Sequence, residues 1–169
     1  MVALVVYESL WGNTAAVARA IAEGIGSGAE ALPTDLATPE RVAAADVLVV
    51  GGPVLGFRLG TDAMRASIAE TEKEAPRPPD LAHPSLRSWL EALPRGAAAC
   101  AAFETRIWWS PRGATGDIEK LLAAAGYRRA ARAEKFVVTD KYGPLRDGEL
   151  ERATAWGRDL ARLVALVPA

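Results

Sequence analysis

The sequence predicts an α/β fold in which a parallel sheet of five strands carries helices on both faces. A strand followed by a helix recurs five times along the chain, which is the order that parallel sheets require. Segments 2–7 and 46–50 are almost continuously apolar rather than alternating, as expected for strands buried on both faces. A chain of 169 residues suits one domain with a sizeable core, so we expect a single domain over 1–169.

In the first part of the chain, segment 2–7 is the first expected strand. Helix 14–25 follows, with apolar residues four apart on one face, and ends where glycines begin. The apolar run 29–32 is short and is stopped by a proline, which favours an edge strand. Thr38 is the expected N-cap of a short helix whose first position is Pro39.

The middle of the chain holds the clearest strand and the most polar stretch. Strand 46–50 runs directly into a glycine-rich segment, 51–57, which we predict to be a loop. A helix is expected over about 61–72. The stretch 71–84 is rich in charge and proline, and we expect an exposed excursion within the domain rather than a linker. The lone histidine, His83, is expected to be a solvated loop residue of this excursion.

The last part of the chain continues the alternation. A short amphipathic helix is expected over 86–93 and a fourth strand over 97–103. The next helix contains 118–122 and closes at a glycine, and the fifth strand centres on 136–138. The final helix has an apolar stripe over 150–164, with acidic residues in its first turn that favour the helix dipole.

Composition and charge limit the partner and the compartment. The formal net charge of −1 argues against nucleic acid or an anionic membrane as the main partner. The single cysteine, Cys100, cannot form an internal disulfide, and its apolar neighbours favour a small buried strand residue. No secretory signal opens the chain, and no apolar run is long enough for a transmembrane segment. We therefore expect a cytoplasmic protein.

A short polar loop between the first strand and the first helix is the main candidate site. It points backbone N–H groups and a positive helix end at whatever it binds, and its side chains add neutral donors. The natural ligand is a phosphate monoester, held without a lysine or arginine in the loop. The nucleotide-hydrolysing P-loop and the Gly-x-Gly-x-x-Gly pattern are both absent. The alternative is an ordinary helix start capped by Asn13 or Thr14. The candidate residues are Ser9, Leu10, Trp11, Gly12, Asn13 and Thr14.

Two further segments leave strands at the same edge, where ligands bind in open parallel sheets. The second offers a glycine that can bring a carbonyl to a planar ring. The third carries adjacent tryptophans, which a planar aromatic ligand would cover; the alternative is an oligomer contact such as a homodimer. The candidate residues are Pro53, Val54, Leu55, Gly56 and Phe57 in the second segment and Glu104, Thr105, Arg106, Trp108 and Trp109 in the third.

Taken together, the three segments resemble the flavodoxin family. Residues 9–14 are similar to its Thr/Ser-x-x-Gly-x-Thr phosphate loop, although Trp11 stands where a threonine is common. The resemblance implies a flavodoxin-like three-layer sandwich with strand order 2-1-3-4-5 and a non-covalent FMN. It also implies that Leu55-Gly56 packs on the inner flavin face near N5, and that Thr105 and Arg106 lie near the pyrimidine edge. Trp108 would be the outer stacking residue, with Trp109 as the alternative.

Three functions remain open at this point. The first is an FMN redox protein that passes electrons to a partner protein, in which no side chain acts as a catalytic acid or base and no metal is needed. The second is an FMN-dependent oxidoreductase of the NAD(P)H/quinone or protoporphyrinogen type, acting on a small flat substrate such as a quinone. The aromatic third segment, the mild net charge and an expected cluster of Arg58, Arg106 and Arg112 favour it. The third is a flavin-free relative that works through protein contacts.

Overall fold

The computed structural model describes residues 1–166 and confirms an α/β architecture. The strands are β1 (Ala3–Tyr7), β2 (Ala29–Pro33), β3 (Val47–Leu55), β4 (Arg58–Leu59), β5 (Ala99–Ile107), β6 (Arg128–Arg129) and β7 (Glu134–Val138). The helices are α1 (Asn13–Ile25), α2 (Pro39–Ala43), α3 (Asp62–Thr71), α4 (Leu86–Glu91), α5 (Thr115–Ala124) and α6 (Glu149–Ala165). The parallel strands run in the order β2-β1-β3-β5, with β6 and β7 both beside β5, which is equivalent to the expected 2-1-3-4-5.

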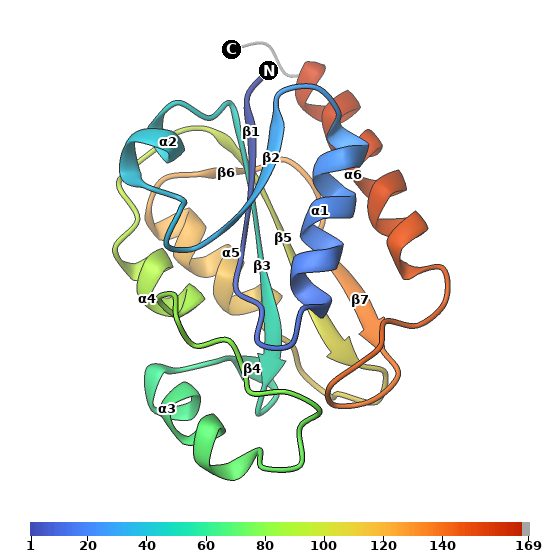
Figure 1. The fold of residues 1–169 in the computed structure, drawn as a ribbon. Coiled ribbons are helices and arrows are strands. Elements are labelled where there is room, and N and C mark those ends of the chain that lie inside the picture. Colours follow the sequence, from blue (N-terminus) through green and yellow to red (C-terminus); the bar gives the residue numbers. More distant parts are fainter. Residues whose placement is uncertain (167–169) are drawn as a thin grey trace.

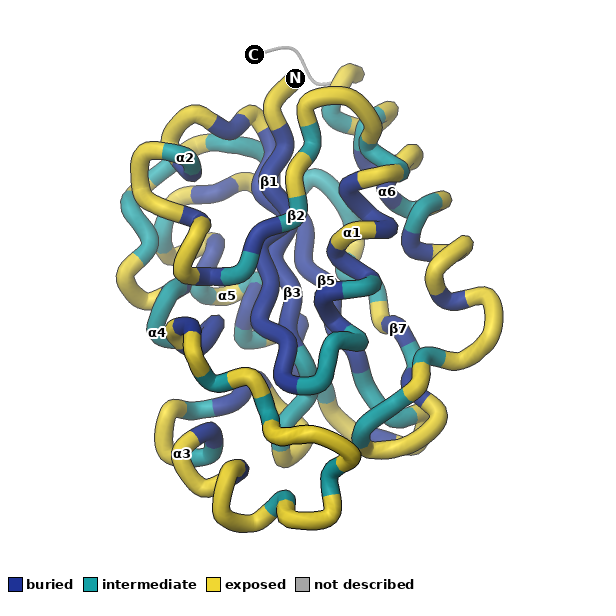
Figure 2. Tube along the Cα trace, in the orientation of Figure 1, coloured by how far each residue is buried: buried dark blue, intermediate teal, exposed yellow. Residues whose placement is uncertain are grey.

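Helices cover both faces of this sheet (Figure 1). One core cluster joins the sheet to α1 and α6, and the other joins it to α2, α4 and α5. The central strands are the most deeply buried part of the chain (Figure 2). No helix within residues 1–166 is long and apolar enough to cross a bilayer.

The helices α1 and α6 pack with their backbones in close contact. A Cβ added at Gly157 of α6 would overlap the carbonyl oxygen of Ile21 and lie 3.1 Å from the Cα of Gly24 on α1. A Cβ at Gly24 would likewise overlap the backbone of Thr154. The glycines are therefore needed for the spacing between these helices.

The fifth strand differs from the expectation because it is made of two pieces. β6 pairs with Ala99 and Cys100, and β7 pairs with β5 from Phe103 onward. The piece centred on 136–138 is the more buried one, since Phe136 is fully covered while both residues of β6 are exposed. The short apolar run of β7 predicts a strand, whereas the two exposed residues of β6 carry no sequence pattern that predicts one.

The prediction of a loop over 51–57 was wrong for 51–55, which is strand, and the fourth predicted strand ends later than expected. β3 continues through Gly51 to Leu55 and turns back into β4, while β5 continues through Glu104 to Ile107. The glycines of β3 are needed because neighbouring side chains pack closely against them, and not because the chain turns there. A Cβ at Gly51 would overlap the ring of Phe103, and one at Gly52 would lie 2.9 Å from Leu86.

The excursion after α3 is mostly exposed, as expected, but His83 is not. His83 is only 7% exposed, so the prediction of a solvated histidine was wrong. Its Nδ1 lies 3.4 Å from Thr34 Oγ1, and its Nε2 lies 3.9 Å from Asp80 Oδ2. The contact with Thr34 joins parts of the chain about fifty residues apart, which a local pattern does not reveal.

The two ends of the sheet have different roles. Met1 and Ala165 line a common hollow of about 620 Å³ beside the amino ends of β3 and β5. The carboxyl ends of the strands, at the opposite pole, carry the candidate site.

Candidate functional site

A cleft of about 660 Å³ opens at the carboxyl ends of β1, β3, β5 and β7. It brings together all three candidate segments. Thirteen of the predicted residues line it: Ser9, Leu10, Trp11, Asn13, Thr14, Pro53, Val54, Leu55, Gly56, Phe57, Thr105, Arg106 and Trp109. Gly12, Glu104 and Trp108 do not.

The helix α1 starts at the cleft without a cap. Its N-cap is Gly12, at φ 98°, with no side-chain hydrogen bond and no acidic residue in the first turn. By contrast, Thr38, Thr61 and Ser85 cap the three helices that follow. The alternative that Asn13 or Thr14 is an ordinary N-cap was therefore wrong. The first N–H groups of α1 and its positive end remain available to an anion.

Hydroxyl and amide side chains surround this helix end. Thr14 Oγ1 and Thr105 Oγ1 lie 2.7 Å apart and are buried, so helix α1 and strand β5 contribute to one polar corner. Ser9 Oγ accepts a hydrogen bond from the Gly12 N–H at 3.1 Å, which fixes the loop. Asn13 Nδ2 donates to the carbonyl of Tyr142 at 3.0 Å. These contacts organise neutral donors around one end of the cleft.

The β3–β4 turn forms one wall of the cleft. Gly56 and Phe57 both have positive φ, at 53° and 65°. A two-residue hairpin turn of this kind favours glycine and asparagine, and a left-handed phenylalanine costs about 1–2 kcal/mol. A Cβ at Gly56 would also lie 2.7 Å from Met64 Cε. The turn therefore holds an aromatic side chain at the mouth of the cleft at the expense of backbone strain.

The tryptophan pair is divided between the cleft and the surface. Trp109 lines the cleft, and its ring meets the Phe57 ring edge-on at a centroid distance of 6.0 Å. Trp108 lies outside the lining and is 73% exposed. Of the two residues, Trp109 is thus the one placed to cover a ring in the cleft.

Glu104 has a supporting position. It is fully buried, accepts a hydrogen bond from the Thr115 N–H at 2.8 Å and pairs with Arg106 at 3.1 Å. Glu104 therefore caps α5 and orients Arg106, which does line the cleft.

Sequence reasoning missed two parts of the cleft wall. These are Met64, Ser67, Ile68, Thr71 and Glu72 from α3 and its end, and Val138, Thr139, Asp140 and Lys141 after β7. Glu72 joins the two parts, since it pairs with Lys141 Nζ at 2.6 Å and accepts a hydrogen bond from the hydroxyl of Tyr142. That hydrogen bond raises the pKa of Tyr142 to about 12. The partners lie about seventy residues apart, so no local signal marked them.

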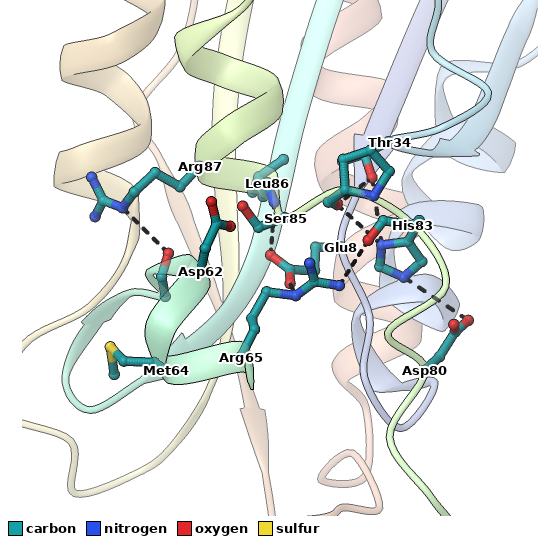
Figure 3. A network of polar contacts seen from close by, with 12 residues as sticks. Glu8, Thr34, Asp62, Met64, Arg65, Asp80, His83, Ser85, Leu86 and Arg87 are labelled. Carbon is teal, nitrogen blue, oxygen red and sulfur yellow. Dashed lines mark hydrogen bonds and ion pairs between the residues drawn. The ribbon is translucent and has the colours of Figure 1, made fainter. Parts of the chain in front are cut away.

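A buried polar network adjoins the loop 9–14 through Glu8 (Figure 3). Glu8, the residue before Ser9, is 1% exposed and lies 2.6 Å from Arg65 Nε. Its other oxygen accepts a hydrogen bond from the Leu86 N–H at 2.9 Å, and Arg65 Nη2 donates to the His83 carbonyl at 2.8 Å. Burial raises the pKa of Glu8. The hydrogen bond from the Leu86 N–H and the positive charge of Arg65 lower it, but by less than burial raises it. The network connects β1, α3, α4 and the excursion.

The cleft combines polar donors with apolar and aromatic walls. One end offers an anion site of N–H groups and hydroxyls, and the other offers apolar and aromatic walls. Within residues 1–166, no group of histidine, cysteine, aspartate and glutamate is arranged to hold a metal ion.

Comparison with solved structures finds this fold in flavodoxins. An archaeal flavodoxin superposes with a TM-score of 0.65 over 98% of this chain and 99% of its own, at 22% identity. A Streptococcus pneumoniae flavodoxin gives 0.66 over 98% of each chain at 14% identity. Two-electron reduced Megasphaera elsdenii flavodoxin gives 0.59 over 95% of this chain and 98% of its own, at 17% identity. No protein-family model and no curated protein matches the sequence.

Proposed function

We propose that this chain, which has the flavodoxin-like fold, binds FMN non-covalently in the cleft and transfers electrons through it. One observation carries the proposal: the uncapped start of α1 and a wall of aromatic residues lie at two ends of the same cleft. FMN has a dianionic phosphate joined to a flat aromatic ring system. The donor set matches the phosphate, and the apolar walls match the ring.

Each group would have a defined task with FMN bound. The N–H groups of α1, with Ser9, Thr14 and Thr105, would hold the phosphate. Leu55 and Trp109 would cover the ring and exclude water from it. The redox chemistry belongs to the flavin, and the protein supplies binding, orientation and electrostatics.

The electron acceptor is proposed to be a redox partner protein, within a reducing cytoplasm. Cys100 suits such a compartment, because it is buried and burial raises its pKa to about 11. A second candidate is an oxidoreductase acting on a small flat substrate such as a quinone. The aromatic pair Phe57 and Trp109 at the mouth of the cleft favours it. Steady-state turnover of NAD(P)H with quinones separates the two functions.

The proposal is tested by titrating the apoprotein with FMN and with riboflavin, which lacks the phosphate. FMN should bind more tightly, and the complex should show the visible absorption of a flavin.

Thr14→Ala removes a hydroxyl donor, and hydrogen bonds to charged groups are worth about 1.5–3 kcal/mol. This variant should weaken FMN binding by about 10- to 100-fold and leave riboflavin unchanged. Thr154→Ala, on α6 and outside the lining of the cleft, is the matched control. Equal affinity for the two flavins would contradict the assignment of Ser9 to Thr14, and binding of neither would leave the flavin-free alternative.

Tryptophan fluorescence can identify the stacking residue. FMN should quench a large part of the emission, because a flavin in contact with an indole ring deactivates its excited state. Trp109→Phe should remove most of the quenching that the pair contributes, whereas Trp108→Phe should remove little, since Trp108 lies outside the cleft. The reverse result would return the stacking role to Trp108. No change in either variant would assign the pair to an oligomer contact.

A further inference from the structure

The indole N–H of Trp11 is a buried donor without an acceptor in the chain. Its Nε1 atom is buried, although the residue as a whole is partly exposed, and it makes no hydrogen bond within residues 1–166. The large majority of buried side-chain polar atoms in proteins are hydrogen-bonded, because an unpaired one has lost its water without gaining a partner. This donor therefore calls for an acceptor.

Three other buried side-chain atoms in the same part of the chain lack a hydrogen bond, but each of them belongs to an ion pair. Glu8 Oε1 lies 2.6 Å from Arg65 Nε. Glu119 Oε1 lies 3.6 Å from Arg129 Nη1. Among the described residues, Trp11 Nε1 is thus the buried polar side-chain atom that neither a hydrogen bond nor an ion pair satisfies.

Trp11 lies in the cleft, at the end where α1 begins. It lines the cleft and directly precedes Gly12, the N-cap residue of a helix start that has no side-chain cap. Its ring meets the Tyr142 ring edge-on at a centroid distance of 4.9 Å, and the Tyr142 carbonyl accepts the hydrogen bond from Asn13 Nδ2. These contacts hold the indole beside the first turn of α1. An aromatic ring is a weaker acceptor than an anionic oxygen, so the Tyr142 ring does not replace one.

We infer that the indole N–H of Trp11 donates a hydrogen bond to the phosphate of the bound ligand. This inference rests on the proposed function, because FMN is the phosphate monoester proposed there. Ser9 and Thr14 bring hydroxyl groups to the loop, whereas the N–H is the donor that the side chain of Trp11 can offer. Trp11 is then a specificity residue, which strengthens the binding of the phosphate group and satisfies its own buried donor.

The first test compares the FMN and riboflavin affinities of wild type, Trp11→Phe and Trp89→Phe. Phenylalanine keeps an aromatic ring against Tyr142 and removes the N–H. Trp89→Phe is the matched control, because Trp89 lies on α4 outside the lining of the cleft and its Nε1 donates to the carbonyl of Ala37 at 3.0 Å. Trp11→Phe should weaken FMN by about 10- to 100-fold and change riboflavin by less than about twofold. Trp89→Phe should change neither affinity.

Two results of this comparison would overturn the inference. Equal losses for both flavins in Trp11→Phe would assign the indole to packing, since the loss would not depend on the phosphate. An FMN affinity that Trp11→Phe does not change would show that the N–H makes no contact with the phosphate. In the second case FMN would still bind more tightly than riboflavin if the proposed function is correct.

Inorganic phosphate provides a readout that does not need a flavin. In ¹H–¹⁵N spectra of the apoprotein, the indole signal that disappears in Trp11→Phe belongs to Trp11, and the one that disappears in Trp89→Phe belongs to Trp89. Phosphate should shift the Trp11 signal saturably to higher ¹H frequency, because an anionic acceptor deshields the donated proton. The Trp89 signal should stay in place, and chloride at equal ionic strength should move neither.

The phosphate titration separates failure of the inference from failure of the proposed function. If wild type binds neither flavin, the proposed function fails, and the titration alone decides on Trp11. A shift of the Trp11 signal by phosphate and not by chloride then supports a donor to another phosphate monoester. A Trp11 signal that responds to phosphate no more than to chloride overturns the inference.

Discussion

Replacing Arg65 with methionine should lower the free energy of unfolding by about 3–5 kcal/mol at neutral pH, which is the expected loss when one partner of a buried ion pair is removed. The Arg65 side chain is 11% exposed and that of Glu8 is 1% exposed. Without the guanidinium, the Glu8 carboxylate stays buried beside an apolar group, and the His83 carbonyl loses its donor. Urea denaturation measures the difference. Arg162→Met is the control, because its pair with Asp159 is largely exposed and such pairs contribute at most about 1 kcal/mol.

The loss should depend on pH in a defined direction. Burial raises the pKa of Glu8 above its ordinary value of 4.5, so the folded protein retains a proton that the unfolded chain releases. The stability from such a group is fully present below about pH 4.5 and is lost as the pH rises through the folded-state pKa. Removing Arg65 raises that pKa further, so the deficit of Arg65→Met should shrink as the pH falls from neutral. The double variant Glu8→Gln/Arg65→Met should recover much of the deficit. A deficit that is the same at every pH would show that packing, not charge, holds Arg65.

Gly157→Ala should lower the free energy of unfolding by about 3 kcal/mol, at the upper end of the usual effect of overpacking. The added methyl group would meet the backbone of Ile21 and Gly24, which cannot rotate away as a side chain can. The two helices must then separate. For a chain of this size the melting temperature should fall by about 6–12 °C.

Gly116→Ala is the matched control for this substitution. Gly116 lies in α5, and a Cβ there meets nothing within 4 Å. Alanine favours a helix over glycine by about 1 kcal/mol, so this variant should be neutral or more stable. If both variants behave alike, the spacing between α1 and α6 is not limited by Gly157.

The fold could be predicted because its signals are local. Strand 2–7 is apolar throughout, Thr38 precedes Pro39 at a helix start, and both features lie within a few residues of one another. The carboxyl end of β3 was misread for the same reason. Glycine is locally a loop signal, and only the ring of Phe103 on a neighbouring strand explains Gly51.

The candidate site could be predicted in part. The residues at the carboxyl ends of β1, β3 and β5 were found because parallel strands bring these ends together. Glu72 and the burial of His83 were not found, since each depends on contacts between segments about fifty to seventy residues apart. No periodicity or motif encodes such a contact.

The hollow shared by Met1 and Ala165 has a practical consequence for electrochemistry. A linker attached before β1 or after α6 leaves the molecule at the pole opposite the cleft, where it obstructs none of the lining residues. A protein tethered there to an electrode would present its cleft to the solution, where the proposed flavin and the proposed partner would reach it freely. The same tether would place the whole length of the sheet between the cleft and the electrode. The current would then depend on a diffusing mediator rather than on direct electron transfer from the cleft to the electrode.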